Sequence, residues 1–158
     1  MIKTTLIGHA SMLIQSNKTT ILTDPVWFDY LWEEVNVLCP SINLDISKIP
    51  PIDVLNISHR HQDHFDVRTL AHLSQNVTML KPKTLILVPK DNILIDVLKE
   101  LDFKNIRIVE DFVDISVGDA TLTPTPSLNE GDSFPEHGLI VNDGEVTIWN
   151  QVDTVVNP

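Results

Sequence analysis

The sequence predicts a single mixed α/β domain, of the α+β or layered α/β class, whose strands form a largely mixed sheet. Three observations favour this class. Short apolar strand segments come in hairpin runs, two amphipathic helical segments lie between them, and turn-forming residues separate the segments. A length of 158 residues with 42% apolar residues suits one domain with a real core.

The N-terminal part of the chain is predicted to form short strands and one long loop. Residues 4–7, 11–15 and 19–23 are strand segments, with a hairpin turn at Asn17-Lys18. Residues 25–51 are irregular and carry four aromatic side chains: Trp27, Phe28, Tyr30 and Trp32. Two roles are open for these aromatics, which are to cap the core or to form a wall or lid over a substrate pocket.

The middle of the chain alternates strands with helices. Residues 54–57 read as a buried strand, and a first helix is expected from Asp66, as its N-cap, to about Ser74. A strand at residues 85–88 precedes a second amphipathic helix over residues 91–101. The apolar side of this second helix consists of Leu94, Ile95, Val97, Leu98 and Leu101.

The last part of the chain is predicted to be β-structure. Three strands are expected, at residues 106–109, 112–117 and 121–123. Gly118-Asp119 marks a turn between the last two of them. Residues 139–141 and 146–149 form a further hairpin, because the Asp-Gly pair in Asn142-Asp143-Gly144 favours a tight turn.

Composition and charge narrow the possible partners. Lys and Arg total 11 against 22 for Asp and Glu, and the resulting formal charge of −11 repels phosphate backbones. We therefore expect no nucleic-acid partner, although a bound metal ion could still attract an anionic substrate. No apolar run is long enough for a transmembrane helix, so no membrane association is expected. The single cysteine, Cys39, and a start without signal-peptide features predict a cytoplasmic protein.

A cluster of potential metal ligands follows the predicted strand at residues 54–57. His59, His61, Asp63 and His64 fall within six positions. In an extended segment His59 and His61 point to the same side, and a turn directly afterwards can bring the other two to an adjacent position. Imidazoles and carboxylates are ligands that zinc prefers, and two-metal hydrolytic sites have ions about 3.5–4 Å apart. Because cysteine is nearly absent, an open, water-bearing site is favoured over a closed structural zinc site.

This run resembles the H-x-H-x-D-H signature of the metallo-β-lactamase superfamily. Residues 6–11 (LIGHAS) and 22–25 (LTDP) resemble its branch of ascorbate-phosphate lactonases and N-acyl phosphatidylethanolamine phospholipase D. The resemblance covers essentially the whole chain but only about the first half of the family's fold. It implies an αβ/βα sandwich of which about one half is present, with two or three helices. Residues 1–158 would be one domain that ends before the family's C-terminal half.

The resemblance also implies a ligand set and a reaction. His59 and His61 would bind a first divalent ion, Asp63 and His64 a second, and Asp153 would bridge the two. The ions would be one or two zinc ions, with manganese as an alternative. Metal-bound hydroxide would attack an ester or phosphoester bond of a small-molecule substrate. Asp63 would also hold or accept a proton from the attacking water, so we expect it to be catalytic.

Four further residues are candidates for additional or supporting roles. The family's third histidine often follows Thr-Pro, where this chain has Asn129, which is a poor zinc ligand. His137 would replace it if the loop folds back, and otherwise it is an exposed loop histidine. Asp24 either holds a ligating imidazole by its other ring nitrogen or forms an Asp-Pro turn. His9 is expected to be a packed or hydrogen-bonded histidine rather than a ligand.

Two alternatives to a hydrolase remain open. One is a non-catalytic metal-binding or interaction protein with a degenerate, incomplete site, and the other is a fragment with no role of its own. Half of the fold would expose an apolar sheet face beyond the few hundred Å² usual for monomers. We therefore expect a homodimer in which two copies supply the two sheets.

Overall fold

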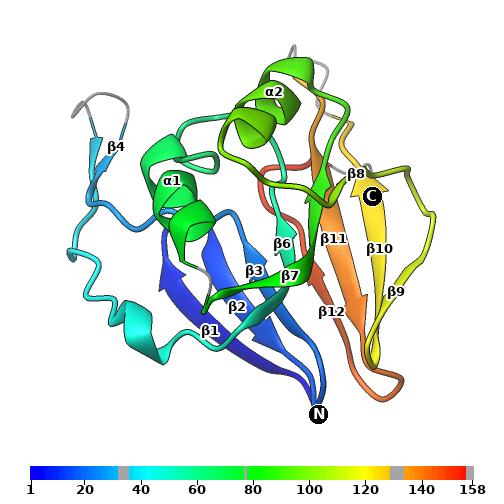
Figure 1. Cartoon of the computed structure of the whole chain (residues 1–158). Helices are drawn as coiled ribbons and strands as arrows, with labels where there is room; N and C mark the ends of the chain where they lie inside the picture. The colour runs from blue at the N-terminus through cyan, green and yellow to red at the C-terminus, as the bar shows by residue number, and fades with distance from the viewer. Residues whose placement is uncertain (32–35, 77, 129–133, 156–158) are drawn as a thin grey trace.

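The fold consists of two packed sheets and two helices, as seen in a computed structural model that describes residues 1–31, 36–76, 78–128 and 134–155 (Figure 1). The first sheet has six strands, in the order β1 (Lys3–Gly8), β2 (Ser11–Gln15), β3 (Thr20–Thr23), β6 (Ile52–Asn56), β7 (Leu80–Val88) and β8 (Ile106–Ile108). The second sheet has four strands, in the order β12 (Thr147–Asn150), β11 (His137–Asn142), β10 (Ala120–Pro126) and β9 (Ile115–Val117).

The first sheet is mixed, as predicted. Strands β1, β2 and β3 pair antiparallel, whereas β3, β6, β7 and β8 pair parallel. Parallel neighbours need crossover connections, and α1 (Val67–Gln75) and α2 (Asn92–Glu100) lie in two of them. The long segment between β3 and β6 holds a small hairpin of β4 (Tyr30–Leu31) and β5 (Asn36–Val37) and the 3-10 turn η1 (Ile46–Lys48).

Each helix begins at an aspartate that satisfies free backbone donors of its first turn. Asp66 accepts from the Thr69 amide, and Asp91 accepts from the Ile93 amide at 3.0 Å. Such caps typically contribute about 1 kcal/mol. Both helix starts were predicted at these aspartates, with Asp66 as an N-cap and Asp91 as the first residue of the second helix, because the apolar periodicity that follows each of them is a local signal.

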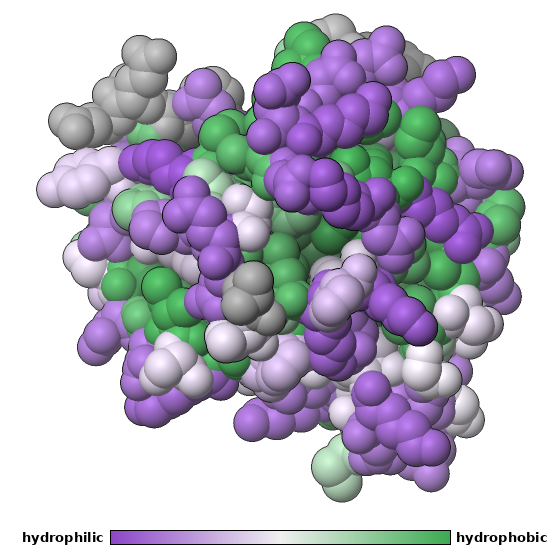
Figure 2. Space-filling view, viewed as in Figure 1, coloured by the Kyte–Doolittle hydropathy of each residue, from purple (hydrophilic) through white to green (hydrophobic). Residues whose placement is uncertain are grey.

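Two hydrophobic cores separate three layers. One core lies between the helices and the first sheet and includes Leu55, Leu70 and Leu94. The other lies between the two sheets and includes Ile14 and Leu139. The helices therefore cover one face of the six-stranded sheet, and the four-stranded sheet covers the other (Figure 1). Figure 2 shows the molecule from the same side as Figure 1, where hydrophilic residues cover much of the surface and hydrophobic residues are visible in the middle.

This layering corrects one expectation from the sequence. The same chain forms both sheets, so the expectation that two copies supply one sheet each is wrong. The apolar face expected to be exposed is covered by the second sheet, which supplies Leu122, Leu139 and Val141 to the inter-sheet core. The homodimer itself stays a prediction.

Two strands also differ from the predicted ones. The expected strand at residues 112–117 is shortened to Ile115–Val117, because Phe112 has a left-handed backbone with φ of 59° and its amide donates to the Pro124 carbonyl. The expected strand at 85–88 begins earlier, at Leu80. There Leu80 pairs with Ile52, although Lys81-Pro82-Lys83 interrupts the apolar pattern.

The aromatic segment after β3 packs on α1. The Trp27 amide donates to the Thr69 hydroxyl at 3.0 Å, and the Arg68 guanidinium lies 4.6 Å from the centre of the Phe28 ring. Tyr30 is exposed, and Trp32 lies outside the described residues. In the part of the chain that the structure describes, neither helix has the length and apolar character needed to cross a membrane.

Candidate metal centre

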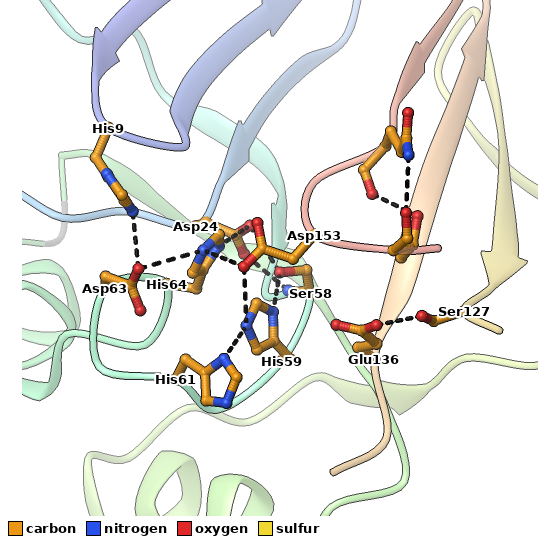
Figure 3. Close-up of polar contacts among 12 residues, drawn as sticks. His9, Asp24, Ser58, His59, His61, Asp63, His64, Ser127, Glu136 and Asp153 are labelled. Carbon is orange, nitrogen blue, oxygen red and sulfur yellow. Dashed lines mark hydrogen bonds and ion pairs between the residues drawn. The ribbon is translucent and has the colours of Figure 1, made fainter. Parts of the chain in front are cut away.

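The candidate ligands meet at one edge of the molecule, where strands from both sheets end (Figure 3). His9 follows β1, Asp24 follows β3, Ser58 and His59 follow β6 closely, and Asp153 follows β12. The β6 strand runs directly into the histidine run, since the Ile57 amide still donates to the Leu87 carbonyl of β7. Ligand sites in open α/β sheets lie at the carboxyl ends of the strands, and this arrangement follows that rule.

A first donor group consists of His59, His61 and Asp153, whose ligand atoms lie within 4.8 Å of one another. His59 Nε2 is 2.8 Å from His61 Nδ1 and 3.9 Å from Asp153 Oδ2. His59 is buried, and its other ring nitrogen lies 2.9 Å from the Ser58 hydroxyl. Ligands at 2.0–2.1 Å from a tetrahedral zinc ion lie roughly 3.3 Å apart, so the observed separations fit such an ion with small adjustments.

A second donor group consists of His9, Asp63 and His64, within the same 4.8 Å limit. Asp63 Oδ2 is 3.0 Å from His9 Nε2 and 3.8 Å from His64 Nε2. Asp153 Oδ2 is 3.5 Å from His64 Nε2 as well as 3.9 Å from His59 Nε2. The Asp153 carboxylate, which is 54% exposed, therefore lies between the two groups (Figure 3).

Asp24 supports this centre from its buried side, through contacts with Ser58 and His64. It is fully buried and has a left-handed backbone with φ of 41°. Its carboxylate accepts from the Ser58 amide at 2.7 Å and from the Ser58 hydroxyl at 2.8 Å, and it lies 3.1 Å from His64 Nδ1. A carboxylate there favours the proton on Nδ1 of His64, which leaves the Nε2 lone pair directed at Asp63 and Asp153.

Burial and neighbouring charges shift the pKa values of three groups at the site. Burial lowers the pKa of His59 to about 4, and the charges of His64 and His61 act in the same direction. Burial also opposes a charge on His64, but the Asp24, Asp63 and Asp153 carboxylates outweigh it and raise the pKa of His64. Burial would raise the pKa of Asp63, but His64 and His9 outweigh it and lower this pKa. At neutral pH the centre thus offers a neutral His59 imidazole and an ionised Asp63.

Of the two remaining sequence candidates, the structure describes His137, which lies outside both donor groups. His137 is buried at the start of β11, where its Nε2 is 2.9 Å from Asn56 Oδ1 and burial lowers its pKa to about 4. It belongs to neither donor group among the described residues, and it is not the exposed loop histidine of the alternative reading. Asn129 lies outside the described residues.

Sequence reasoning undervalued His9 and missed Glu136, which lies near the centre but in neither donor group. His9 joins the second donor group through a left-handed backbone with φ of 50°. Glu136 lies beside the histidine run, because the next amide, of His137, donates to the Ser58 carbonyl at 3.2 Å. Its carboxylate accepts from the Ser127 hydroxyl, and its second oxygen is buried without a hydrogen-bond partner and extends toward His59 in Figure 3.

Two cavities are relevant to the centre, and donor-group residues line the first of them. One of about 350 Å³ is lined by His9, His64 and Asp153 and by four apolar residues: Leu6, Ala10, Met12 and Val152. Another of about 440 Å³ lies at the ends of β7, β8 and β10 and includes Phe134, Glu136 and His137 in its walls. An open centre with space beside it suits a site that admits a substrate better than a closed structural site.

Comparisons with known proteins agree with this fold. The profile of the β-lactamase superfamily domain matches residues 3–150. A 4-amino-L-phenylalanyl-[peptidyl-carrier-protein] 3-hydroxylase from Streptomyces venezuelae is 31% identical over 155 residues, which cover 94% of this chain and 28% of that protein. The chain thus spans less than a third of the length of this curated relative.

Solved structures show the same architecture. A diiron β-hydroxylase from Streptomyces venezuelae superimposes with a TM-score of 0.74 at 25% identity, covering 97% of this chain and 30% of that one. A metallo hydrolase from the archaeon Ignicoccus hospitalis has a TM-score of 0.63 at 17% identity, covering 97% of this chain and 61% of that one. The match of the family profile over nearly the whole chain, with the histidine run at the carboxyl end of β6, shows that this chain belongs to the metallo-β-lactamase superfamily.

Proposed function

We propose that this chain forms the metal-binding part of a metal-dependent hydrolase that binds two divalent ions, most simply zinc, with manganese as an alternative. The observation that carries the proposal is the pair of donor groups with Asp153 between them, 3.9 Å from His59 Nε2 and 3.5 Å from His64 Nε2. A carboxylate placed between two sets of imidazoles can bridge two ions, as two-metal hydrolytic sites require.

The donor chemistry assigns each residue to one ion. His59 and His61 would hold the first ion and Asp63 and His64 the second, with Asp153 shared. Glu136 is a further candidate donor to the first ion, because its second carboxylate oxygen is buried without a hydrogen-bond partner. His137 Nε2 contacts Asn56, and its Nδ1 is likewise buried without a partner. An uncompensated buried carboxylate oxygen is costly, and a cation would remove that cost.

His9 and Asp24 would support the second ion in different ways. His9 Nε2 is close enough to Asp63 Oδ2 either to join the ion or to orient that carboxylate by a hydrogen bond. Asp24 holds the proton on Nδ1 of His64 and so keeps Nε2 available. When bound, ions in such a site supply a Lewis acid and a water whose pKa is lowered to about 7.

The catalytic role expected of Asp63 depends on the charge that its carboxylate carries at neutral pH. Because its pKa is lowered, it is a weak base and a strong hydrogen-bond acceptor at neutral pH. Its part in the reaction would be to bind and orient, and to hold a proton only transiently.

The substrate would be a small ester or phosphoester. The cavity beside the second donor group has apolar walls at Leu6, Ala10, Met12 and Val152, which suit an apolar portion of such a substrate next to the reacting bond. The net charge of −11 still argues against a nucleic-acid partner.

A cytoplasmic location and a homodimer are also proposals. The outer face of the second sheet, where Trp149 is 43% exposed, is the surface that a second copy would contact, which sedimentation would test.

A second candidate function is metal-dependent oxidation. It is favoured by the similarity to the diiron β-hydroxylase, which is higher in identity and TM-score than that to the archaeal hydrolase. The donor set of imidazoles and carboxylates is also compatible with iron. Under this alternative the same residues would hold iron, and the substrate would be oxidised rather than hydrolysed.

One experiment separates these functions. The protein would be loaded separately with zinc, manganese and ferrous iron, and each form assayed with p-nitrophenyl esters, a bis-p-nitrophenyl phosphate diester, and, for iron, oxygen uptake with a reductant. Hydrolysis by the zinc or manganese form that is lost in H59A/H61A supports the proposal. Oxygen uptake by the iron form alone supports the alternative, and inactivity of all three forms supports the non-catalytic binding role.

A further inference from the structure

We propose that Arg60 is a positioning residue that fixes the His61 imidazole through the ring of Phe134, and so sets the affinity of the first donor group. This inference rests on the proposed function. Arg60 occupies the position between the two ligand histidines of the first group. Its side chain turns away from the donor atoms and contacts a different part of the molecule.

The first contact of Arg60 is with the start of α2. Its Nε lies 3.1 Å from Asp91 Oδ2, and the Asp91 side chain is only 6% exposed. The other oxygen of Asp91 accepts from the Ile93 and Leu94 amides as the N-cap of α2. Asp91 is therefore held by the helix, and it gives Arg60 a rigid and largely buried anchor.

The second contact is with an aromatic ring. The Arg60 guanidinium carbon lies 3.7 Å from the centre of the Phe134 ring, a close cation–π contact. The Phe134 ring in turn meets the His61 ring edge to face, with centres 5.5 Å apart and an interplanar angle of 86°. A continuous series of contacts thus runs from the α2 cap through Arg60 and Phe134 to a candidate ligand.

His61 is more exposed than its partner in the group, so packing against its ring has more influence on its orientation. His59 is 1% exposed and has the Ser58 hydroxyl against its second ring nitrogen. His61 is partly exposed, and the Phe134 ring covers one side of it. A ligand that is held in one orientation loses less conformational entropy on binding an ion than a ligand that is free to rotate.

The chain contains a matched arrangement away from the donor atoms. Arg68 Nε lies 2.9 Å from Asp66 Oδ1, Asp66 is the N-cap of α1, and the Arg68 guanidinium lies 4.6 Å from the Phe28 ring centre. Both arginines therefore pair with a capping aspartate and lie on a phenylalanine. Only Arg60 connects this arrangement to a histidine of the first donor group, so Arg68 provides an internal control.

The stacked geometry explains why the residue is arginine. A guanidinium is planar and can lie on a ring while its charge pairs with a carboxylate at its edge, as Arg60 does with Asp91, whereas a lysine ammonium is a point charge that cannot do both in this way. Arg60→Lys should keep the attraction to Asp91 and lose the stacking on Phe134. This variant therefore separates positioning of the ring from simple charge pairing.

The test is cobalt titration of the metal-free full chain, followed by visible absorption, with H61A as the reference for loss of the first group. We expect wild type to bind two ions, and R60A and F134L to weaken one of them about 10- to 100-fold with an altered visible spectrum, as loss of a supporting contact typically does. R60K should resemble F134L, and R68A should resemble wild type. Urea unfolding of each variant would confirm a folded chain.

Two results would overturn the inference. One is R60A and F134L binding both cobalt ions with wild-type affinity and spectrum, and the other is R68A losing affinity to the same degree. If wild type binds no cobalt, the proposed function fails instead. The positioning role is then decided by the histidine imidazole NMR signals of the metal-free chain. The His61 signals should change in R60A and F134L but not in R68A, and unchanged signals in all three would refute the role.

Discussion

Replacement of Asp24 by asparagine tests how the second donor group is held. The change keeps the size of the side chain, and asparagine tolerates the left-handed backbone at this position. It replaces one of two carboxylate oxygens by an NH₂ group, although three groups depend on those oxygens: the Ser58 amide, the Ser58 hydroxyl and His64 Nδ1. All of these contacts are buried, so water cannot replace the one that is lost.

Each orientation of the new amide has a defined cost. If its oxygen faces His64, its NH₂ faces the Ser58 amide, and a buried unsatisfied donor costs about 1–3 kcal/mol. If its oxygen faces the Ser58 amide, its NH₂ faces His64 Nδ1, and the imidazole must move its proton to Nε2. That tautomer cannot offer Nε2 to a cation. We expect a loss of about 1–3 kcal/mol in the free energy of unfolding or a shift in tautomer, and in either case metal affinity about 10- to 100-fold lower.

The measurements are urea unfolding of the metal-free chain, isothermal titration with zinc and the imidazole NMR signals of His64. Ser58→Ala is the comparison variant for the His64 signals: it removes one contact of Asp24 and the contact with His59 Nδ1, but it leaves the carboxylate facing His64, so these signals should stay as in wild type. Wild-type stability together with wild-type zinc affinity in D24N would refute the supporting role of Asp24.

Three other predictions concern the metal-free chain, its packing and its metal. The pKa of about 4 for buried His59 and His137 lies below the usual 6.5, so the unfolded chain binds more protons and stability should fall as pH drops from about 6.5 to about 4. His137 alone accounts for about 3 kcal/mol of this loss, and His137→Gln should flatten the pH profile of urea midpoints; an unchanged slope would count against it. A Cβ at Gly138 would lie 2.6 Å from Thr125 Oγ1 and 2.9 Å from Trp149 Nε1, so G138A should cost about 1–3 kcal/mol, whereas an equally stable variant would contradict this packing. Chelation should lower the unfolding midpoint, since an ion at 100 times its Kd contributes about 2.7 kcal/mol, and no shift with EDTA would argue against a bound ion.

The fold could be predicted wherever the signals are local. The helix starts at Asp66 and Asp91 were found because a 3.6-residue apolar period follows each aspartate, although only Asp66 was recognised as a cap. The early start of β7 was missed because its pairing is non-local: Leu80 pairs with Ile52, and Lys81 forms an ion pair with Asp53. The packing of the last hairpins as a second sheet on the first was missed for the same reason.

The residues of the candidate site also divide into those with a local sequence signal and those placed by non-local contacts. His59, His61, Asp63 and His64 are neighbours in sequence, so their clustering was visible directly. His9 comes from the end of β1, three positions from β6 in the sheet, and its orientation depends on a left-handed backbone with φ of 50°.

Glu136 was missed because its position depends on how the start of β11 docks onto the histidine run. One of the contacts that fix this docking is a backbone hydrogen bond from the His137 amide to the Ser58 carbonyl. Contacts of this kind carry no side-chain signal, so the sequence alone does not indicate them.

The central claim is that two donor groups share Asp153 and bind two ions. Its most direct test is the metal content of the purified chain by plasma mass spectrometry after zinc loading and gel filtration, with H59A/H61A alongside. We expect about two ions per chain in wild type and about one in the double variant, because His9, Asp63 and His64 remain intact. Wild type without tightly held metal, or a double variant that keeps both ions, would contradict the claim.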